Sequence, residues 1–279
     1  MPDQDCVGFL QWCLPRLGLR WPGYRKVRRT VCKRVGRRRR ELGLGDLDAY
    51  RAYLRDHPDE WARLDADCRI PISRFYRDRG VFDYLGRSAL PEVAESAAAR
   101  GRRRLRCWSA GCASGEEVYT LRVLWDLSVQ PIRPGVGPGV GFEILGTDAD
   151  AALLRRAEAA RYQGGSLKDL PAAWRDAAFT GDGKAFVLRP EFRRDVAFQE
   201  ADIRHRQPDG PFDLVLCRNL VFTYFAPGLQ AALQRAIAAR LAPGGYLAIG
   251  AHERLPVEAG DLVPVAPELP IYRKAPASA

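Results

Sequence analysis

The stretch "RCWSAGCASGEEVYTL" (106–121) joins an apolar run, a glycine-containing turn and an amphipathic segment. This order predicts a buried strand, a tight turn and a helix, the arrangement in which nucleotides bind at a helix N-terminus. Two acids, Glu116 and Glu117, directly follow the second glycine and would repel a phosphate group. The turn therefore favours a nucleoside-like, cationic ligand without phosphate, and S-adenosylmethionine has these properties.

Downstream of about residue 70, short apolar runs alternate with helical patterns. "LRCWSA", "FEILGT", "FDLVLC" and "GYLAIG" are typical of buried strands, whereas "DAALLRRAEAARY" and "GLQAALQRAIAARL" are typical of helices. This alternation predicts an α/β fold with a parallel sheet covered by helices on both faces. The extended pattern at about 181–198 predicts a short antiparallel insert.

Residues 1–70 carry helical patterns instead. Two stripes at helical spacing predict the buried faces of two helices: Val27, Val31 and Val35, then Leu47, Tyr50 and Leu54. The arginines and lysines around the valines are expected to face outward. We therefore expect a small, basic, all-α domain at the N-terminus.

Composition restricts the classes of protein. The chain has 279 residues, of which 47% are hydrophobic, so it can bury a core. No apolar run of about 18 residues is present, and no basic segment precedes the first apolar stretch, which argues against membrane insertion and a signal peptide. The seven cysteines include no CxxC pair, so we expect free thiols in a reducing cytoplasm rather than a disulfide framework or a metal site.

The positive charge is concentrated at the N-terminus. The first forty residues hold twelve Lys or Arg and two Asp, which equals the net charge of +10 of the whole chain. An acidic protein, nucleic acid or a membrane surface could bind such a segment, and a solvated helix face would explain it equally. The absence of a recognisable reader motif argues against nucleic acid.

Several acids are candidates for holding the nucleoside, each with a structural alternative. Glu117 ends a Ser-x-x-Glu capping box, so Glu116 is the better ligand candidate. Asp148 ends a predicted strand, where a ribose is held in nucleotide-binding folds, yet Asp148 or Asp150 could instead cap the next helix. Asp202 could meet an adenine edge or be a loop acid.

A further strand runs directly into Arg218 and Asn219, followed by an aromatic cluster. Polar residues at the carboxyl end of a parallel strand point into the ligand crevice. The alternative is a solvent-facing arginine beside core aromatics, which suits Phe222 and Phe225 better than Asn219 or Tyr224.

Five motifs in order make the chain resemble the CheR-type chemoreceptor glutamate O-methyltransferases over nearly its whole length. They are "SRFYRD" (73–78), "WSAGCASGEEVYTL" (108–121), "GTDAD" (146–150), "CRNLVFTYF" (217–225) and "LAPGGYLAIGAHERL" (241–255). The resemblance implies an all-α domain (1–70), a Rossmann-like methyltransferase domain (71–279), S-adenosylmethionine as cofactor and no metal. It also implies an acidic protein partner, such as the cytoplasmic helices of a chemoreceptor.

The resemblance assigns roles to individual residues. Arg77 and Tyr224 would be catalytic. The cofactor would be lined by Ser73, Arg77, Gly111, Glu116, Asp148, Asp202, Ile203, Arg218 and Asn219. Three departures affect the substrate more than the cofactor: Thr223 competes with Tyr224 for the family tyrosine, Pro71 replaces a common asparagine, and His252 replaces a small hydroxyl residue. A same-fold methyltransferase with another acceptor and a noncatalytic binding module are therefore the alternatives.

Overall fold

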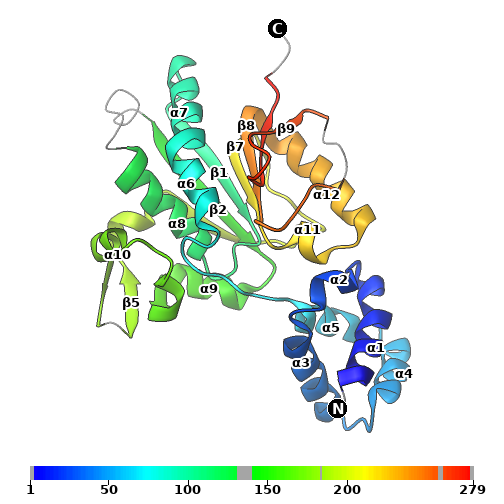
Figure 1. The fold of residues 1–279 in the computed structure, drawn as a ribbon. Helices are drawn as coiled ribbons and strands as arrows, with labels where there is room; N and C mark the ends of the chain where they lie inside the picture. The colour runs from blue at the N-terminus through cyan, green and yellow to red at the C-terminus, as the bar shows by residue number, and fades with distance from the viewer. Residues whose placement is uncertain (1–2, 131–139, 183, 257–259, 277–279) are drawn as a thin grey trace. The chain divides into compact units, whose positions relative to one another are not determined.

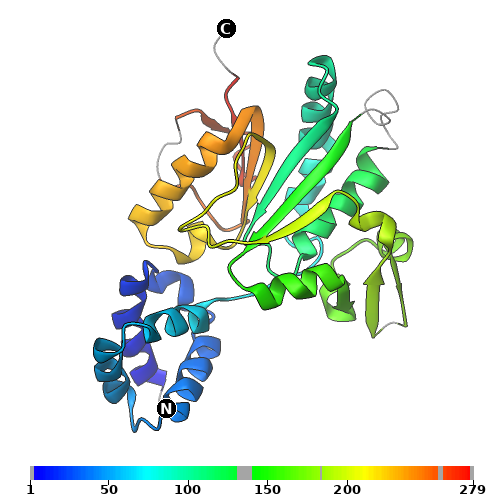
Figure 2. The same cartoon turned by 180° about the vertical axis from the view of Figure 1, so that it is seen from behind.

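The computed structural model describes residues 3–130, 140–182, 184–256 and 260–276, and it contains two compact units (Figures 1 and 2). The first unit comprises residues 1–71 with 223–230, and the second comprises 72–222 with 231–279. Segment 223–230, expected in the second domain, belongs to the first unit because its backbone bonds there. Ala226 N–H donates to the Gly18 carbonyl and Arg20 N–H to the Tyr224 carbonyl, both at 2.8 Å.

The second unit is built on a seven-stranded sheet with the order β6-β2-β1-β7-β8-β10-β9. Its strands are β1 (Arg104–Ala110), β2 (Gly141–Asp148), β6 (Val196–Glu200), β7 (Phe212–Cys217), β8 (Leu241–Ile249), β9 (Leu262–Pro264) and β10 (Ile271–Lys274). The first five run parallel, and β10 pairs antiparallel with β8 and β9. The α/β prediction is confirmed, and β7 is buried along its whole length, as expected for a strand covered on both faces.

Helices cover both faces of this sheet. They are α6 (Arg79–Tyr84), α7 (Leu90–Ala99), α8 (Glu116–Leu124), α9 (Ala151–Ala159) and α12 (Pro227–Arg240), with π-helical turns η2 (Leu85–Ala89) and η3 (Trp125–Val129). The short helix α11 (Val221–Tyr224) lies in the connection between β7 and α12. The crossovers through α8 and α9 progress toward β6, whereas the crossover through α12 progresses toward β8. Because such crossovers are right-handed, α12 lies on the opposite face from α8 and α9 (Figures 1 and 2).

A small antiparallel sheet is inserted between α9 and β6. Its order is β3-β5-β4, from β3 (Arg161–Gln163), β4 (Phe179–Gly181) and β5 (Ala185–Leu188), and it is joined by η4 (Gly164–Leu167), α10 (Ala172–Ala178) and η5 (Pro190–Arg193). The insert was predicted, but its bounds of about 181–198 were wrong. It starts earlier because β3 pairs with β5 across a long connection, and it ends earlier because Val196–Glu200 pairs with β2 in the main sheet.

The first unit is helical, as expected. It contains α1 (Asp3–Cys13), η1 (Leu14–Leu17), α2 (Trp21–Tyr24), α3 (Arg28–Glu41), α4 (Leu47–Asp56) and α5 (Glu60–Cys68). Both predicted stripes are buried except at Val27, which is half-buried because α3 begins only at Arg28. In α4, Asp46 caps the first turn by accepting the Ala49 N–H at 2.8 Å.

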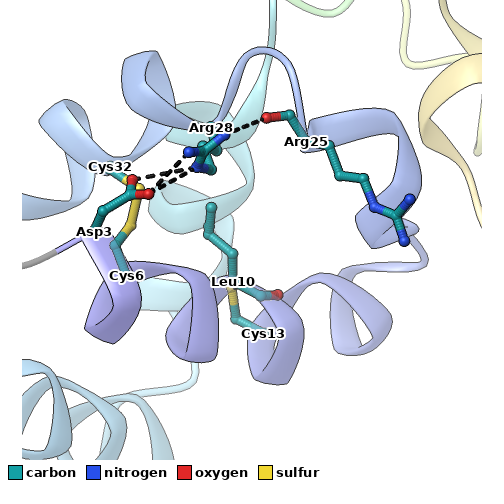
Figure 3. The surroundings of a disulfide bond; sticks show 7 residues. All are labelled: Asp3, Cys6, Leu10, Cys13, Arg25, Arg28 and Cys32. Atoms are coloured by element: carbon teal, nitrogen blue, oxygen red, sulfur yellow. Dashed lines mark hydrogen bonds and ion pairs between the residues drawn. A yellow bond between two sulfur atoms is a disulfide. The ribbon is translucent and has the colours of Figure 1, made fainter.

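A disulfide joins α1 to α3, which corrects the expectation of free thiols only (Figure 3). Cys6 and Cys32 have Cα atoms 5.9 Å apart, a separation within the usual range for a disulfide. Next to this bond, Arg28 donates to the carboxylate of Asp3 at 2.9 Å. An odd number of scattered cysteines gave no sign of this pair, because two helices bring them together across 26 positions of sequence.

Within the described parts of the chain, the helices are too short or too polar to cross a bilayer. The same parts contain no group of three or more His, Cys, Asp or Glu side chains arranged to hold a metal ion.

Candidate functional site

The carboxyl ends of five parallel strands meet at one edge of the main sheet. The chain leaves β1 toward β2 and β6, and later leaves β7 in the other direction toward β8. The boundary between β1 and β7 is therefore the topological switch point, where ligands bind in open α/β sheets. The predicted site residues of the second unit either come after the carboxyl ends of these strands or lie in the segment 73–78.

The glycine turn after β1 is tightly constrained. Gly111 and Gly115 have φ of 74° and 86°, a conformation that favours glycine. A Cβ atom on Gly115 would come within 2.8 Å of the Ala157 side chain, so this glycine is also required by packing. Gly111 N–H donates to the Thr147 carbonyl at 2.8 Å, which fixes the turn against β2.

Glu116 and Glu117 are not helix caps, and the capping box is not formed. Gly115 occupies the N-cap position of α8, so Ser114 lies one residue too early to cap it. The Ser114 hydroxyl instead donates to the carboxylate of Glu116, which is only 2% exposed. Glu117 accepts the Ser109 hydroxyl at 2.8 Å and an Arg218 N–H at 2.6 Å.

The two aspartates after β2 have separate roles. Asp150 caps α9 by accepting the Ala152 N–H at 2.8 Å, whereas Asp148 does not cap the helix. One Asp148 carboxylate oxygen accepts the Ala113 N–H at 2.9 Å and the other accepts the Asp150 N–H at 3.0 Å. Asp148 thus links the glycine turn to the end of β2, with a carboxylate at the edge where a ribose would lie.

Asp202 and Ile203 follow β6. The Asp202 carboxylate pairs with the Arg204 guanidinium at 2.6 Å. Burial alone would raise the pKa of the Asp202 carboxyl, but the bonds to Arg204 hold the pKa below its ordinary value. Ile203 is buried. Asp202 is therefore an ionised acid with a cationic neighbour that sequence reasoning did not identify.

Arg218 is a buried junction rather than an exposed charge. Its side chain is 2% exposed and lies 4.9 Å from the centre of the Phe82 ring. Its Nη1 donates to Glu117 at 2.6 Å, and its Nη2 donates to the Arg77 carbonyl at 2.6 Å and to Asp78 at 2.8 Å. Arg218 thereby holds the segment containing Arg77 against the end of β7.

Arg77 and Asn219, both predicted to lie at the site, are in direct contact. Arg77 Nη2 donates to the Asn219 side-chain oxygen at 3.2 Å, and Nη1 donates to the Ile72 carbonyl at 2.7 Å. Ser73 is half-buried in the same segment. The Asn219 N–H donates to the Glu253 carboxylate at 2.9 Å.

Backbone strain gathers at this edge. Six non-glycine residues among those described have left-handed φ, and four are here: Tyr76, Asp78, Ala113 and Asn219. Each is held by a side chain, since Thr120, Arg218, Asp148 and Glu253 respectively bond to it. Such conformations cost of order 1–3 kcal/mol each and are common at functional sites.

Tyr224 and Thr223 lie in the first unit. The Tyr224 ring centre is 5.1 Å from that of Tyr24, and Arg20 Nε donates to the Thr223 carbonyl at 3.0 Å. A Cβ atom on Gly23 would overlap that carbonyl oxygen. Contacts with Tyr24, Arg20 and Gly23 thus hold the Thr223–Tyr224 segment within the first unit.

Sequence reasoning missed three acids of this site. Glu117 was interpreted as a cap, and neither Asp78 nor Glu253 was considered. Both lie inside the quoted motifs "SRFYRD" and "GAHERL", and Glu253 follows a parallel strand closely, which is the signal that could have identified it.

The chemistry of the edge fits S-adenosylmethionine. Carboxylates dominate the turn and the ends of β2 and β6, and these groups accept hydrogen bonds from ribose hydroxyls and an ammonium group while repelling phosphates. The residues that would hold the cofactor are chiefly Glu116 at the glycine turn, Asp148 after β2 and Asp202 after β6.

The chain is similar to known proteins over both units. Residues 72–267 match the family described as "CheR methyltransferase, SAM binding domain", and residues 18–64 match "CheR methyltransferase, all-alpha domain". A chemotaxis protein methyltransferase of Listeria innocua is 33% identical over 67% of this chain and 66% of its own length. A probable chemotaxis protein methyltransferase of Rhizobium etli is 30% identical over 82% of this chain and 85% of its own length.

The similarity to solved structures is weaker. A SAM-bound amino pentose methyltransferase from Micromonospora echinaspora has a TM-score of 0.30 at 21% identity, over 64% of this chain and 58% of that chain. The family matches are specific, and the matched domain makes S-adenosylmethionine the cofactor of the second unit. Because the SAM-binding match covers more than half of its residues, the chain belongs to the CheR methyltransferase family.

Proposed function

We propose that this protein transfers a methyl group from S-adenosylmethionine to glutamate carboxylates of an acidic protein, such as a chemoreceptor. The chain spans about two thirds of the length of the Listeria relative, which is named a chemotaxis protein methyltransferase. The observation that carries the proposal is the placement of Arg77. Two of its five N–H groups bond to Ile72 and Asn219, so its guanidinium can still orient a carboxylate.

The reaction needs little acid–base chemistry from the protein. A glutamate side chain is already a carboxylate at neutral pH, so no base has to remove a proton before attack. When bound, the cofactor supplies a methyl group on a cationic sulfur. The residues at the sheet edge would bind and align the reactants and exclude water, and transfer would leave a methyl ester.

We assign each predicted residue a role in the proposed reaction. Arg77 would orient the acceptor carboxylate, and Tyr224 would contribute to catalysis. Ser73, Gly111, Glu116, Asp148, Asp202, Ile203 and Asn219 would line the cofactor. Arg218 was predicted to line it as well; because its Nη1 and Nη2 both donate to protein acceptors, we propose that it contributes mainly by holding the Arg77 segment.

Docking of the acidic partner would use the first unit. Helix α3 presents exposed Arg29, Lys33 and Arg40 on one helical stripe, whereas Arg28 and Arg34 bond within the unit. Arg28 and Arg34 are expected to face outward; both are half-buried, and their bonds within the unit leave them less available to a partner. We infer that the partner is the cytoplasmic part of a receptor and that the enzyme acts in the cytoplasm.

A labelled-methyl assay tests the proposal. The protein, S-adenosylmethionine labelled in its methyl group and a receptor cytoplasmic fragment should yield labelled receptor that releases methanol in mild base, because methyl esters hydrolyse there. The same fragment with glutamines at its acceptor glutamates is the control. Label that is stable to base would contradict glutamate esterification and favour the same-fold enzyme with another acceptor.

A further inference from the structure

Glu253 is a buried carboxylate that connects two strand ends. Its residue is 3% exposed, and its Oε2 atom accepts the Asn219 N–H at 2.9 Å and the Gly250 N–H at 2.6 Å. Asn219 follows β7, and Gly250 follows β8. One oxygen atom therefore fixes both turns at the same edge of the sheet, and hydrogen bonds to a charged acceptor are the stronger kind.

Packing around Gly250 leaves little freedom in this arrangement. A Cβ atom on Gly250 would come within 2.7 Å of Glu253 Oε2 and 2.9 Å of the Asn219 side-chain oxygen. Asn219 also has a left-handed φ of 56°, a strained conformation for a residue with a side chain. Glu253 thus holds a turn that would otherwise relax.

The orientation of Asn219 affects Arg77. The same Asn219 whose N–H is held by Glu253 accepts the Arg77 Nη2–H at 3.2 Å through its side chain. Glu253, Asn219 and Arg77 therefore form a chain of contacts that ends at a guanidinium at the sheet edge. Each contact lies within the second unit.

We propose that Glu253 is a positioning residue of the methyl-transfer site: it holds the left-handed turn of Asn219 so that Asn219 aligns Arg77. The inference rests on the proposed function for its consequence in catalysis. The positioning itself is a property of the fold and can be measured without an acceptor.

A double-mutant cycle tests this inference. Glu253→Ala and Asn219→Ala should each reduce turnover at least tenfold, and the double variant should be no slower than the slower single variant, because Glu253 acts through Asn219. Glu253→Gln keeps an acceptor oxygen and should remain within about threefold of wild type if the geometry, more than the charge, is what Glu253 supplies.

Asp213→Ala is the matched control. Asp213 is 4% exposed, accepts the Arg106 N–H at 3.0 Å and lies on the same strand, β7, near its other end. It should lose stability as Glu253→Ala does and keep its turnover at a temperature where both variants are folded. Turnover that falls equally in both variants would mean that Glu253 is only structural.

Two measurements separate failure of this inference from failure of the proposed function. The first is amide hydrogen exchange around residues 217–221, which should become faster in Glu253→Ala and not in Asp213→Ala. The second is the same double-mutant cycle with S-adenosylmethionine affinity, measured by calorimetry, in place of turnover. A wild type that binds the cofactor and methylates no carboxylate would defeat the proposed function alone. Unchanged exchange in Glu253→Ala, or effects on affinity that multiply in the double variant, would overturn the positioning role.

Discussion

At the scale of single residues, Asp148 and Asp150 are expected to have different roles, Asp148 in cofactor binding and Asp150 in helix stability. Asp150 caps α9, whereas Asp148 bonds to the glycine turn at the ligand edge. We expect Asp148→Ala to weaken S-adenosylmethionine binding by about 1–3 kcal/mol, the cost of losing a hydrogen bond to a charged group.

Asp150→Ala is the control for this prediction. It should cost about 0.5–2 kcal/mol of stability, as the loss of a helix cap does, with little change in cofactor affinity. Calorimetry gives the affinities and thermal unfolding gives the stabilities. If Asp150→Ala weakens binding as much as Asp148→Ala does, Asp148 has no special role at the ribose.

The Asp78 carboxyl should make stability depend on acid pH. Burial alone would raise the pKa of Asp78, but the Arg218 and Arg77 guanidiniums hold the pKa below its ordinary value. In the unfolded chain the pKa is about 3.9, so the unfolded state takes up the proton first as the pH falls. The stabilisation is therefore fully present above the unfolded pKa and is lost as the pH falls through the lower folded pKa.

Asp78→Asn measures this contribution. We expect the variant to have a lower Tm than wild type at pH 7, because Arg218 loses a charged partner. The difference should shrink between about pH 4 and pH 2, where wild type also becomes protonated. A Tm difference that stays constant over this range would contradict the assignment.

At the scale of elements, the sequence pattern predicted the strands and helices that are determined by interactions between residues close in sequence. The strand, glycine turn and helix at 106–121 are β1, the turn and α8, because burial and φ are set within a few residues. The insert was misplaced because β3 has three residues and is defined only by its partner β5. The disulfide was missed for a similar reason, since helix packing brings Cys6 and Cys32 together.

The site residues show the same difference between local and long-range information. Arg77 and Asn219 occur in recognisable motifs, and the structure joins them. Glu117 and Asp78 could not be assigned from sequence, because their partner is an arginine 101 and 140 positions away, respectively. Glu253 follows a strand, which is a signal, but its bond to a backbone N–H 34 positions away is visible only in the fold. Only the fold shows which acids remain for a ligand and which hold the backbone.

The Cys6–Cys32 bond is an element-scale contribution to stability. Closing a loop between cysteines separated by 26 positions restricts the unfolded chain and should stabilise the first unit by about 3.5 kcal/mol in the chain-entropy model. We expect a reducing agent to lower the denaturant midpoint of the first unit. Cys6→Ser should lower it equally and should no longer respond to the reductant, whereas a wild type insensitive to reductant would show that the bond does not form in solution.

At the scale of the whole molecule, charge is divided unevenly along the chain. The first forty residues carry the net charge of +10. The valines of α3 are used in its own core, and Arg28, Arg34 and Arg38 are bonded to Asp3, to backbone carbonyls and to Glu60. Within α3, the charge left for a partner is therefore mainly the exposed stripe of Arg29, Lys33 and Arg40. Arg25 and Lys26, which precede the helix, are exposed as well.

Reversing this stripe should weaken the encounter with an acidic substrate. We expect a variant with glutamate at Arg29, Lys33 and Arg40 to raise the KM for a receptor fragment several-fold without changing S-adenosylmethionine affinity. Electrostatic complementarity chiefly raises the association rate and the selectivity. The difference from wild type should fade as salt rises, because exposed charges are screened over about 8–10 Å at physiological ionic strength.

The control for stripe reversal changes an equal charge elsewhere. Arg87, Arg155 and Arg194 are exposed residues of the second unit. Their reversal changes the net charge by the same amount without altering α3, and it should leave the KM near that of wild type. The same variants are then offered duplex and single-stranded nucleic acid. If wild type binds nucleic acid and not the receptor fragment, and stripe reversal abolishes that binding, the basic helix serves a nucleic-acid-binding module and the docking proposal is wrong. If both reversals raise the KM equally, net charge rather than the α3 stripe attracts the substrate.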